Sequence, residues 1–231
     1  MTDERMPEAS VYEAELKYMP YAKSLEKVTD LICSLTPRNA RLVDLMSGTG
    51  YLLGEIAKRR SDLVLLGIDI DPRYVNFARD QHPQITFETG DVLTWNPSHP
   101  FDVFTCTGAL HHVQYDQQEE AVRRMANMIH QHGFGIISDC YVGSYSNEKE
   151  RKLAAAKMGY EYLKATIRNG STDDVTAVTA DILKNDVMGI EFKTSLVRRL
   201  PIFHKFFTSV ETYKTWPDEE TDYGDYITAL K

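Results

Sequence analysis

The chain has 231 residues, enough for one substantial hydrophobic core but few for two ordinary domains. Its 26 Lys and Arg residues against 34 Asp and Glu residues give a formal net charge of −8. This balance disfavours the broad basic surface that tight nucleic-acid binding requires. The N-terminus has no apolar signal core, and no apolar run approaches the roughly 20 residues of a membrane span. The three cysteines show no CxxC spacing. We therefore expect a cytoplasmic protein with no membrane segment and no metal site.

The N-terminal region has apolar residues at helical spacing over 11–35. Pro20 is expected to divide this stretch into two helices, because proline lacks a backbone donor and clashes with the preceding turn. The segment 36–39, Thr-Pro-Arg-Asn, has the composition of a turn.

Strands and helices are then expected to alternate. Asp71-Pro72 marks one helix start, with the aspartate as N-cap and the proline in the first turn. The predicted strands are 41–45, 63–70, 85–89, 101–106 and 135–140. The predicted helices between them are 51–60, 73–81 and 116–131. This alternation indicates an α/β fold with a doubly wound, mostly parallel sheet covered on both faces.

The pattern changes after about Tyr141. Helices are predicted at 146–168, 173–188 and 191–206, and two final strands at 208–216 and 223–231. The helical insertion before these strands is far longer than a crossover needs. We therefore predict a single domain, 1–231, built from a helical lid (1–36), a cofactor-binding core (41–140), a helical cap (141–206) and a final strand pair (207–231).

Polar residues stand at the ends of successive predicted strands, at the sheet edge where α/β folds bind ligands. Asp44 opens a loop with glycines at 48 and 50, which lets the backbone turn tightly before a helix N-terminus. Asp69 ends the second strand, where a carboxylate can accept hydrogen bonds from ribose hydroxyls. Asp91 ends the third strand, beside the expected position of an adenine. Either aspartate could instead serve only as a turn residue.

The loop is a poor match to a dinucleotide-binding pattern. The third glycine of Gly-x-Gly-x-x-Gly would fall at position 53, which is leucine. Asp44 would repel a pyrophosphate, whereas it complements the ammonium and sulfonium groups of S-adenosylmethionine. The electrostatics therefore favour that methyl donor over NAD.

Several ordered motifs between Leu42 and Asp139 are similar to those of the class I S-adenosylmethionine-dependent methyltransferases. They are Val43–Gly50, Gly67–Pro72, Gly90-Asp91-Val92, Phe101-Asp102-Val103, Ala109–Val113 and Gly133–Asp139. The resemblance implies a seven-stranded sheet whose last strand is antiparallel, with S-adenosylmethionine as cofactor and S-adenosylhomocysteine as its product. The family loop usually has glycine where this chain has Met46. The cofactor-binding residues expected here are Asp44, Ser47, Gly48, Thr49, Gly50, Asp69, Ile70, Asp91, Val92, Thr107 and Tyr18.

The sequence indicates the acceptor site less clearly than the cofactor site. His111 and His112 follow the fourth strand, where the methyl group should point. His112 could contact substrate or cofactor or only pack, and the hypothesis for its catalytic role is that of a general base; His111 could contact substrate or only pack in the loop. The sequence leaves open whether a general base is used. Tyr18, or its neighbours Tyr12 and Tyr21, could stack near the sulfonium or merely be half-buried helix residues. Tyr141 and Tyr145 flank the cap and could line an acceptor pocket or pack in the core.

The leading hypothesis is a methyltransferase that acts on an O, N or C nucleophile of a small-molecule acceptor by in-line displacement. Three alternatives stay open: a methyltransferase of protein or RNA, an enzyme that modifies the donor itself, and a sensor without turnover. A cationic residue from the 190s near the sulfonium would favour the donor-modifying enzyme. The sequence leaves the oligomeric state open.

Overall fold

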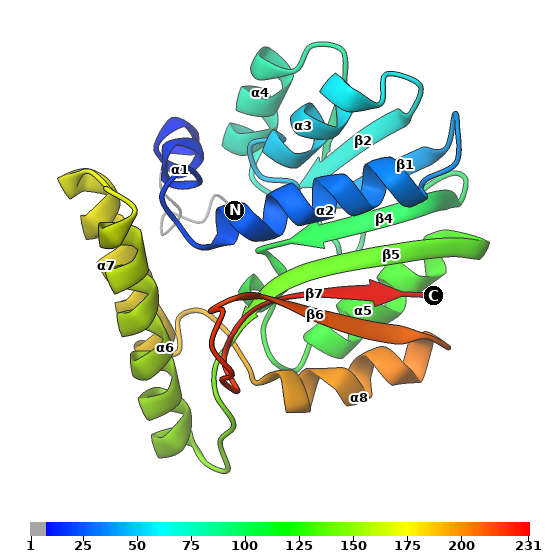
Figure 1. Cartoon of the computed structure of the whole chain (residues 1–231). Coiled ribbons are helices and arrows are strands. Elements are labelled where there is room, and N and C mark those ends of the chain that lie inside the picture. The colour runs from blue at the N-terminus through cyan, green and yellow to red at the C-terminus, as the bar shows by residue number, and fades with distance from the viewer. Residues whose placement is uncertain (1–7) are drawn as a thin grey trace.

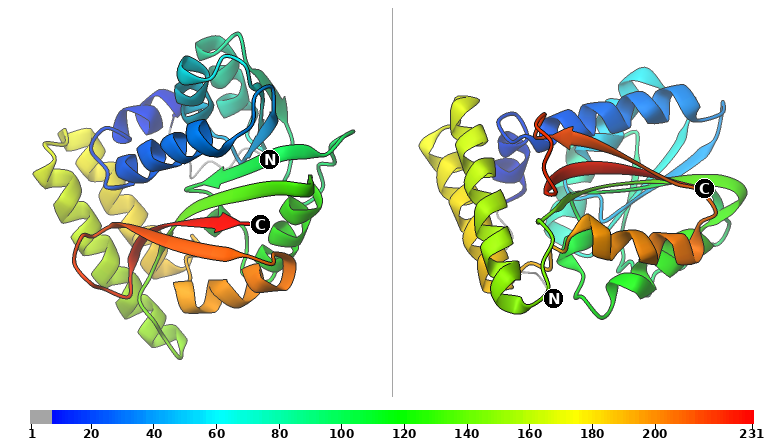
Figure 2. Two further views of the ribbon diagram at one scale, coloured as in Figure 1. Left: turned by 45° about the vertical axis from the view of Figure 1, so that its right-hand side comes forward. Right: turned by 60° about the horizontal axis from the view of Figure 1, so that its bottom comes forward.

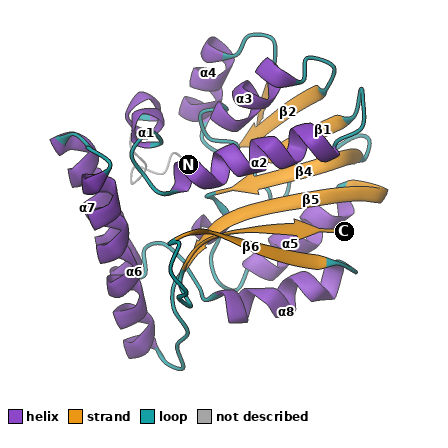
Figure 3. Ribbon diagram, in the orientation of Figure 1, coloured by secondary structure: helices purple, strands orange, loops and turns teal. Residues whose placement is uncertain are grey.

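A seven-stranded sheet in the order β3-β2-β1-β4-β5-β7-β6 forms the centre of the computed structural model, which describes residues 8–231 (Figure 1, Figure 3). β7 pairs antiparallel with both of its neighbours, and all other pairs are parallel. The predicted fold class is therefore confirmed. The strands are β1 (Arg41–Leu45), β2 (Val64–Asp69), β3 (Thr86–Thr89), β4 (Phe101–Thr107), β5 (Ile129–Tyr141), β6 (Val210–Trp216) and β7 (Gly224–Leu230).

Helices cover both faces of the sheet (Figure 2). The helices are α1 (Ala9–Glu15), α2 (Tyr21–Leu35), α3 (Tyr51–Arg59), α4 (Pro72–Gln81), α5 (Gln118–Asn127), α6 (Glu148–Arg168), α7 (Asp173–Met188) and α8 (Leu196–Phe206), with a short 3₁₀ turn η1 (Leu110–His112). One buried apolar cluster joins α2, α3 and α4 to one face of the sheet. A second joins α5 and α8 to the other face. The parallel strands are thus buried on both sides, as a doubly wound sheet requires.

The break at Pro20 is confirmed, since α1 ends at Glu15 and Pro20 is the N-cap of α2. The buried residues of α2 recur at helical spacing and form the apolar stripe that packs on the sheet. They are Tyr21, Ser24, Leu25, Val28, Thr29 and Ile32. The predicted lid includes residues 1–7, which lie outside the described residues.

Two predicted helix boundaries are wrong. The helix predicted at 116–131 ends at Asn127, because Ile129 already pairs with Phe101 in the sheet. The apolar pattern that predicted a longer helix continues into Ile129, which instead begins the long strand β5. The helix predicted at 191–206 begins only at Leu196. Residues 191–195 form a loop, which carries part of the site.

The helices α6 and α7 form an antiparallel hairpin that stands beyond one end of the sheet (Figure 1). Asn147 and Thr172 cap them, each accepting a hydrogen bond from a backbone amide in the first turn. Buried Arg151 joins the two helices by donating to the carbonyl oxygen of Asp186. Among residues 8–231, no helix combines the length and the apolar character needed to cross a bilayer.

Candidate active site at the carboxyl edge of the sheet

The loop after β1 turns sharply through left-handed backbone conformations. Met46, Gly48 and Gly50 have φ values of 59°, 53° and 76°. Ser47 ties the loop to β2 by donating its amide hydrogen to the carbonyl oxygen of Ile68. Gly50 is the N-cap residue of α3, so the amides of the first turn of that helix face the loop. Met46 keeps the left-handed conformation that glycine adopts more readily, with its side chain packed against the buried cluster under α5 and α8.

Gly48 and Gly50 form a matched pair for measuring how strongly each position of the loop requires glycine. A Cβ on Gly50 would lie 2.6 Å from Phe87 Cζ, whereas a Cβ on Gly48 would meet nothing closer than 3.9 Å. Gly48→Ala is expected to lower the free energy of unfolding by about 1 kcal/mol through backbone strain alone. Gly50→Ala adds a steric clash and is expected to cost about 2–4 kcal/mol. Urea unfolding of both variants measures the difference, and equal losses would contradict it.

Asp69 connects the loop to the end of β2. One of its carboxylate oxygens accepts the amide of Gly48 at 2.8 Å, and the other accepts the amide of Asp71 at 2.9 Å. Burial raises the pKa of Asp69, and these two amides oppose the rise. The carboxylate is therefore held in place by the backbone, and each oxygen keeps a lone pair for a ligand hydroxyl.

Asp44 lies at the mouth of the loop and is only 1% exposed. Thr105 of β4 donates its hydroxyl hydrogen to Asp44 Oδ1 at 2.7 Å. Burial raises the pKa of Asp44 to about 7, against the effect of this hydrogen bond, and the nearby Asp69 adds to the rise. A buried acid with so high a pKa is suited to a cationic ligand, which would favour the charged form.

The remaining cofactor-binding candidates flank this edge. Asp91 Oδ1 accepts the amide of Leu93 at 2.8 Å, and Val92 beside it is buried. Ile70, directly after β2, is 50% exposed although it is a large apolar residue. An exposed apolar side chain next to Asp69 is suited to the face of a planar ring. Thr107 ends β4 and is half-buried.

Tyr12, rather than Tyr18, is the N-terminal tyrosine at the glycine loop. Its ring packs edge-on against Tyr74 of α4 and lies about 4.0 Å from a Cβ placed on Gly48. Tyr18 instead accepts a hydrogen bond through its backbone oxygen from Asn169, between α6 and α7. Tyr18 does not line the cavity described below, and its binding of cofactor stays a prediction.

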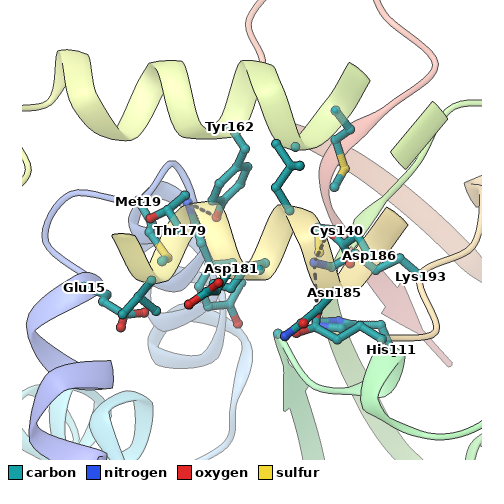
Figure 4. A pocket seen from close by; sticks show the side chains of 18 of the residues that line it. Glu15, Met19, His111, Cys140, Tyr162, Thr179, Asp181, Asn185, Asp186 and Lys193 are labelled. Carbon is teal, nitrogen blue, oxygen red and sulfur yellow. Dashed lines mark hydrogen bonds and ion pairs between the residues drawn. The ribbon is translucent and has the colours of Figure 1, made fainter. Parts of the chain in front are cut away.

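A cavity of about 310 Å³ lies next to this edge, between the N-terminal helices and the hairpin (Figure 4). The end of β4 contributes Gly108, His111 and His112, and the end of β5 contributes Cys140. The other walls come from three regions. They are the N-terminal segment (Tyr12, Glu15, Leu16, Met19, Tyr21), the hairpin (Met158, Gly159, Tyr162, Val178, Thr179, Asp181, Ile182, Leu183, Asn185, Asp186) and the loop before α8 (Glu191, Lys193).

His111 and Asp139 form a buried pair at the cavity wall. Asp139, near the end of β5, lies 2.5 Å from His111 Nδ1 through its Oδ1 atom. Burial acts to raise the pKa of Asp139, but His111 and then Arg199 lower it. Asp139 therefore stays ionised and orients the imidazole, whose Nε2 atom lies on the opposite side of the ring, 3.6 Å from Glu191 Oε2.

His112 lies in a different environment. Burial, and then the neighbouring His111, lower the pKa of His112 to about 4. Its ring packs on that of His111 with the two centroids 4.3 Å apart. An imidazole with so low a pKa is neutral at physiological pH and binds a proton only weakly.

A buried ion cluster completes this end of the cavity. Lys193 Nζ lies 2.8 Å from Asp186 Oδ2 and 3.1 Å from Glu191 Oε2. Burial opposes the charge on Lys193, but Asp186 and its other anionic neighbours raise its pKa well above normal. His111, His112 and Glu191 also present atoms at distances suited to a metal ion. The Lys193 ammonium already balances Glu191 and would repel such an ion.

Comparison with known proteins agrees with this architecture. Residues 42–133 match the family model described as a methyltransferase domain. The structure of N-methyltransferase NodS from Bradyrhizobium japonicum covers 93% of this chain and 89% of its own, with a TM-score of 0.63 and 11% identity. The structure of ChlM from Synechocystis, a magnesium protoporphyrin IX methyltransferase, covers 92% and 84%, with a TM-score of 0.61 and 14% identity. The matched stretch carries the glycine loop and the acids that follow β1 and β2, and the two solved structures share the fold of this chain.

Curated relatives match a smaller part of this chain than the solved structures do. A trans-aconitate 2-methyltransferase of Mycobacterium ulcerans is 35% identical over 85 residues, 36% of this chain and 32% of its own length. A carboxy-S-adenosyl-L-methionine synthase of Campylobacter lari is 26% identical over 125 residues, 52% of each chain. The chain thus spans about half, or less, of the length of these relatives.

Two predicted substrate residues lie outside the cavity. Tyr141 is buried and packs edge-on against Tyr226. Tyr145 bonds Thr194 through its hydroxyl, and Arg198 lies over its ring. Both point away from the cavity because β5 and the loop after it turn these side chains toward β7 and α8.

Three functional candidates, Asp139, Glu15 and Glu191, were missed by the sequence analysis, and Lys193 was anticipated only as a cation from the 190s. Asp139 follows the same strand-end rule as Asp44 and Asp69, so that rule could have identified it. Glu15, Glu191 and Lys193 have no such local signal. They reach the cavity only because α1 and the loop before α8 pack against the ends of β4 and β5.

Proposed function

We propose that this chain transfers a methyl group from S-adenosylmethionine to a small-molecule acceptor. The main supporting observation is the position of the cavity, which begins at Gly108 immediately beyond β4. The glycine loop and Asp69 occupy the ends of β1 and β2 in the same sheet. An acceptor in the cavity would thus face a ligand held across those strand ends.

The residues present fit the cofactor. Asp69 offers both carboxylate oxygens to the ribose hydroxyls, and Ile70 with Val92 offers apolar surface to adenine. Asp44 supplies a buried carboxyl group for the cationic amino acid portion, whose carboxylate can meet the amides at the start of α3. ChlM from Synechocystis has been solved with bound S-adenosylhomocysteine and with bound S-adenosylmethionine, and NodS with S-adenosylhomocysteine.

S-adenosylmethionine supplies an activated methyl group on a positively charged sulfur. The protein therefore has three tasks: to align the acceptor with that group, to exclude water, and to remove a proton from the acceptor. Alignment falls to the cavity walls, and α1 with the hairpin excludes water. The acceptor atom attacks carbon in line with the departing sulfur, so the walls must hold it beyond Gly108.

We assign proton removal to His111 rather than His112. The ionised Asp139 at Nδ1 of His111 favours the imidazolium that forms when Nε2 takes a proton. Among the described residues no carboxylate is hydrogen-bonded to the His112 ring, and its pKa of about 4 makes it a weak base. This assignment reverses the roles that the sequence analysis gave the two histidines.

A macromolecular acceptor is less well supported. The cavity is walled by α1, α6 and α7, and about 310 Å³ suits a compact molecule. Trans-aconitate 2-methyltransferase, the relative named above, acts on a small molecule by its name. We also propose the cytoplasm as the compartment, because Cys33, Cys106 and Cys140 are unpaired thiols.

Chemistry that modifies the donor is the second candidate, because the match to a carboxy-S-adenosyl-L-methionine synthase favours it. The cation from the 190s that lines the cavity is Lys193. Its charge is balanced by Asp186 and Glu191, so it offers little attraction to an anionic substituent on the donor. We therefore rank methyl transfer first.

Calorimetry and product analysis test the proposed function. The purified protein should bind both S-adenosylmethionine and S-adenosylhomocysteine. Incubation with methyl-labelled donor and a pool of small metabolites should yield labelled product with equimolar S-adenosylhomocysteine. Absence of binding would refute the proposal, and a donor product of altered mass would favour the second candidate.

The pKa of Asp44 predicts a pH dependence for donor binding. In the free protein burial raises this pKa to about 7, so the carboxyl is mostly protonated below that pH. A cationic ligand favours the ionised form, and binding should therefore release a proton at low pH. The affinity for S-adenosylmethionine is expected to rise by up to about ten-fold per pH unit from pH 5.5 to 7 and then level off.

Calorimetric titrations across that range measure this dependence. Asp44→Asn keeps an acceptor for the Thr105 hydroxyl but cannot ionise. The variant should bind more weakly at pH 7.5 and lose most of the slope. A slope that persists in Asp44→Asn would contradict the assignment.

A further inference from the structure

Glu15, the last residue of α1, is an unusual group in the cavity wall. Its side chain is 1% exposed, and neither carboxylate oxygen has a hydrogen-bond partner among the described residues. It nevertheless lines the cavity, as Figure 4 shows. An ionised carboxylate buried without a partner is unstable by several kcal/mol. As far as residues 8–231 are concerned, the position is therefore stable only when Glu15 is protonated or when a ligand supplies the partner.

The lysine of the cavity wall and His111 already have carboxylate partners. Lys193 pairs with Asp186 and Glu191, and His111 pairs with Asp139. In Figure 4, Glu15 lies with Asp181 and Tyr162 at one end of the cavity, while His111 and Lys193 lie at the other. The lining residues of the described chain thus provide no free cation for Glu15.

We propose that the acceptor carries an ammonium or similar cationic group, which Glu15 binds at the end of the cavity remote from His111. This inference rests on the proposed function and narrows its substrate class. The cationic group anchors the acceptor, and a second, nucleophilic atom of the same molecule reaches His111. Such two-point binding would fix the reacting atom relative to the donor.

The surroundings of Glu15 support a cationic occupant. Four acidic residues line the cavity (Glu15, Asp181, Asp186 and Glu191) against a single lysine. The same wall carries three tyrosines, Tyr12, Tyr21 and Tyr162, and aromatic faces attract cations. Burial raises the pKa of Glu15 to about 7, so it can remain neutral in the empty cavity and ionise when a cation enters.

The positive charge could instead come from the sulfonium of the donor. The two sources are separated by comparing S-adenosylmethionine with S-adenosylhomocysteine, which lacks the sulfonium charge. If Glu15 serves the acceptor, Glu15→Gln should leave the affinity for each of the two ligands unchanged within about two-fold. A loss of about ten-fold or more for S-adenosylmethionine alone, or for both ligands, which share the α-ammonium group, would assign Glu15 to the donor and overturn the proposal.

The acceptor arm uses matched pairs of amine and neutral probes, such as tyramine with tyrosol and glucosamine with glucose. Each is titrated by calorimetry into the protein saturated with S-adenosylhomocysteine. At least one amine is expected to bind about ten-fold or more tightly than its neutral partner. Glu15→Gln should abolish that preference, whereas Glu26→Gln, at an exposed carboxylate of α2, should retain it.

Two results would reject the inference. One is a wild-type protein that prefers no amine in the panel, a readout that needs no variant. The other is a preference that survives in a folded Glu15→Gln protein. Failure of the wild-type protein to bind either adenosyl ligand is a separate outcome, which refutes the proposed function itself.

Discussion

His111→Asn is expected to lower the turnover number by roughly 10²–10⁴-fold, the usual contribution of a general base. Asparagine can still donate to Asp139 from its amide nitrogen, in place of Nδ1, but it has no counterpart of Nε2. The variant should therefore keep its fold and its affinity for S-adenosylmethionine. Turnover is measured as S-adenosylhomocysteine release with an acceptor found by the metabolite screen.

His112→Asn is the matched control, because the two imidazoles lie side by side in the same cavity wall. It is expected to lower turnover by less than about ten-fold, since His112 is a weak base. Asp139→Asn should resemble His111→Asn, because it removes the charge that stabilises the imidazolium. If His112→Asn alone abolished turnover, the sequence-based assignment of the general base to His112 would be right.

Asp69→Ala is expected to weaken binding of S-adenosylmethionine by about 10²–10³-fold. Hydrogen bonds to a charged group contribute about 1.5–3 kcal/mol each, and this carboxylate can make two to the ribose. The substitution also removes the acceptor for the amide of Gly48, so the glycine loop loses one of its supports. Calorimetry with both adenosyl ligands measures the loss, which should be similar for the two because both carry the ribose.

Asp71→Asn, two residues further along the chain, is the control for Asp69→Ala. Asp71 caps α4 by accepting the amide of Arg73 at 2.9 Å, and asparagine caps helices equally well. Donor affinity should therefore change by less than about three-fold. Equal losses in the two variants would mean that Asp69 acts by holding the loop rather than by binding the ribose.

Much of the fold was predictable because its signals are local. Burial on both faces makes the parallel strands continuous apolar runs, and the helices between them show periodic apolar residues. Pro20 and Asp71 mark helix boundaries by their own backbone chemistry, and the structure has both boundaries as predicted. The predicted helix 116–131 was too long because pairing of Ile129 with Phe101, distant in sequence, decides where that helix must end.

The group of acids at the carboxyl edge of the sheet was likewise predictable from the sequence. In a parallel sheet the carboxyl ends of the strands meet at one edge, so strand order alone brings Asp44 and Asp69 together. The acceptor cavity has no such rule. Its charged residues come from α1, α7 and the loop before α8, segments whose positions depend on packing against the rest of the fold.

The sequence by itself determined the sheet, the glycine loop and the acids that follow β1 and β2, because short-range periodicity and strand ends carry that information. Only the tertiary structure decided that Asp139 partners His111, that Asp186 and Glu191 balance the charge of Lys193, and that Glu15 is buried with no hydrogen-bond partner in the described part of the chain. Those properties depend on desolvation and on neighbours brought from distant parts of the chain, and no local pattern encodes either.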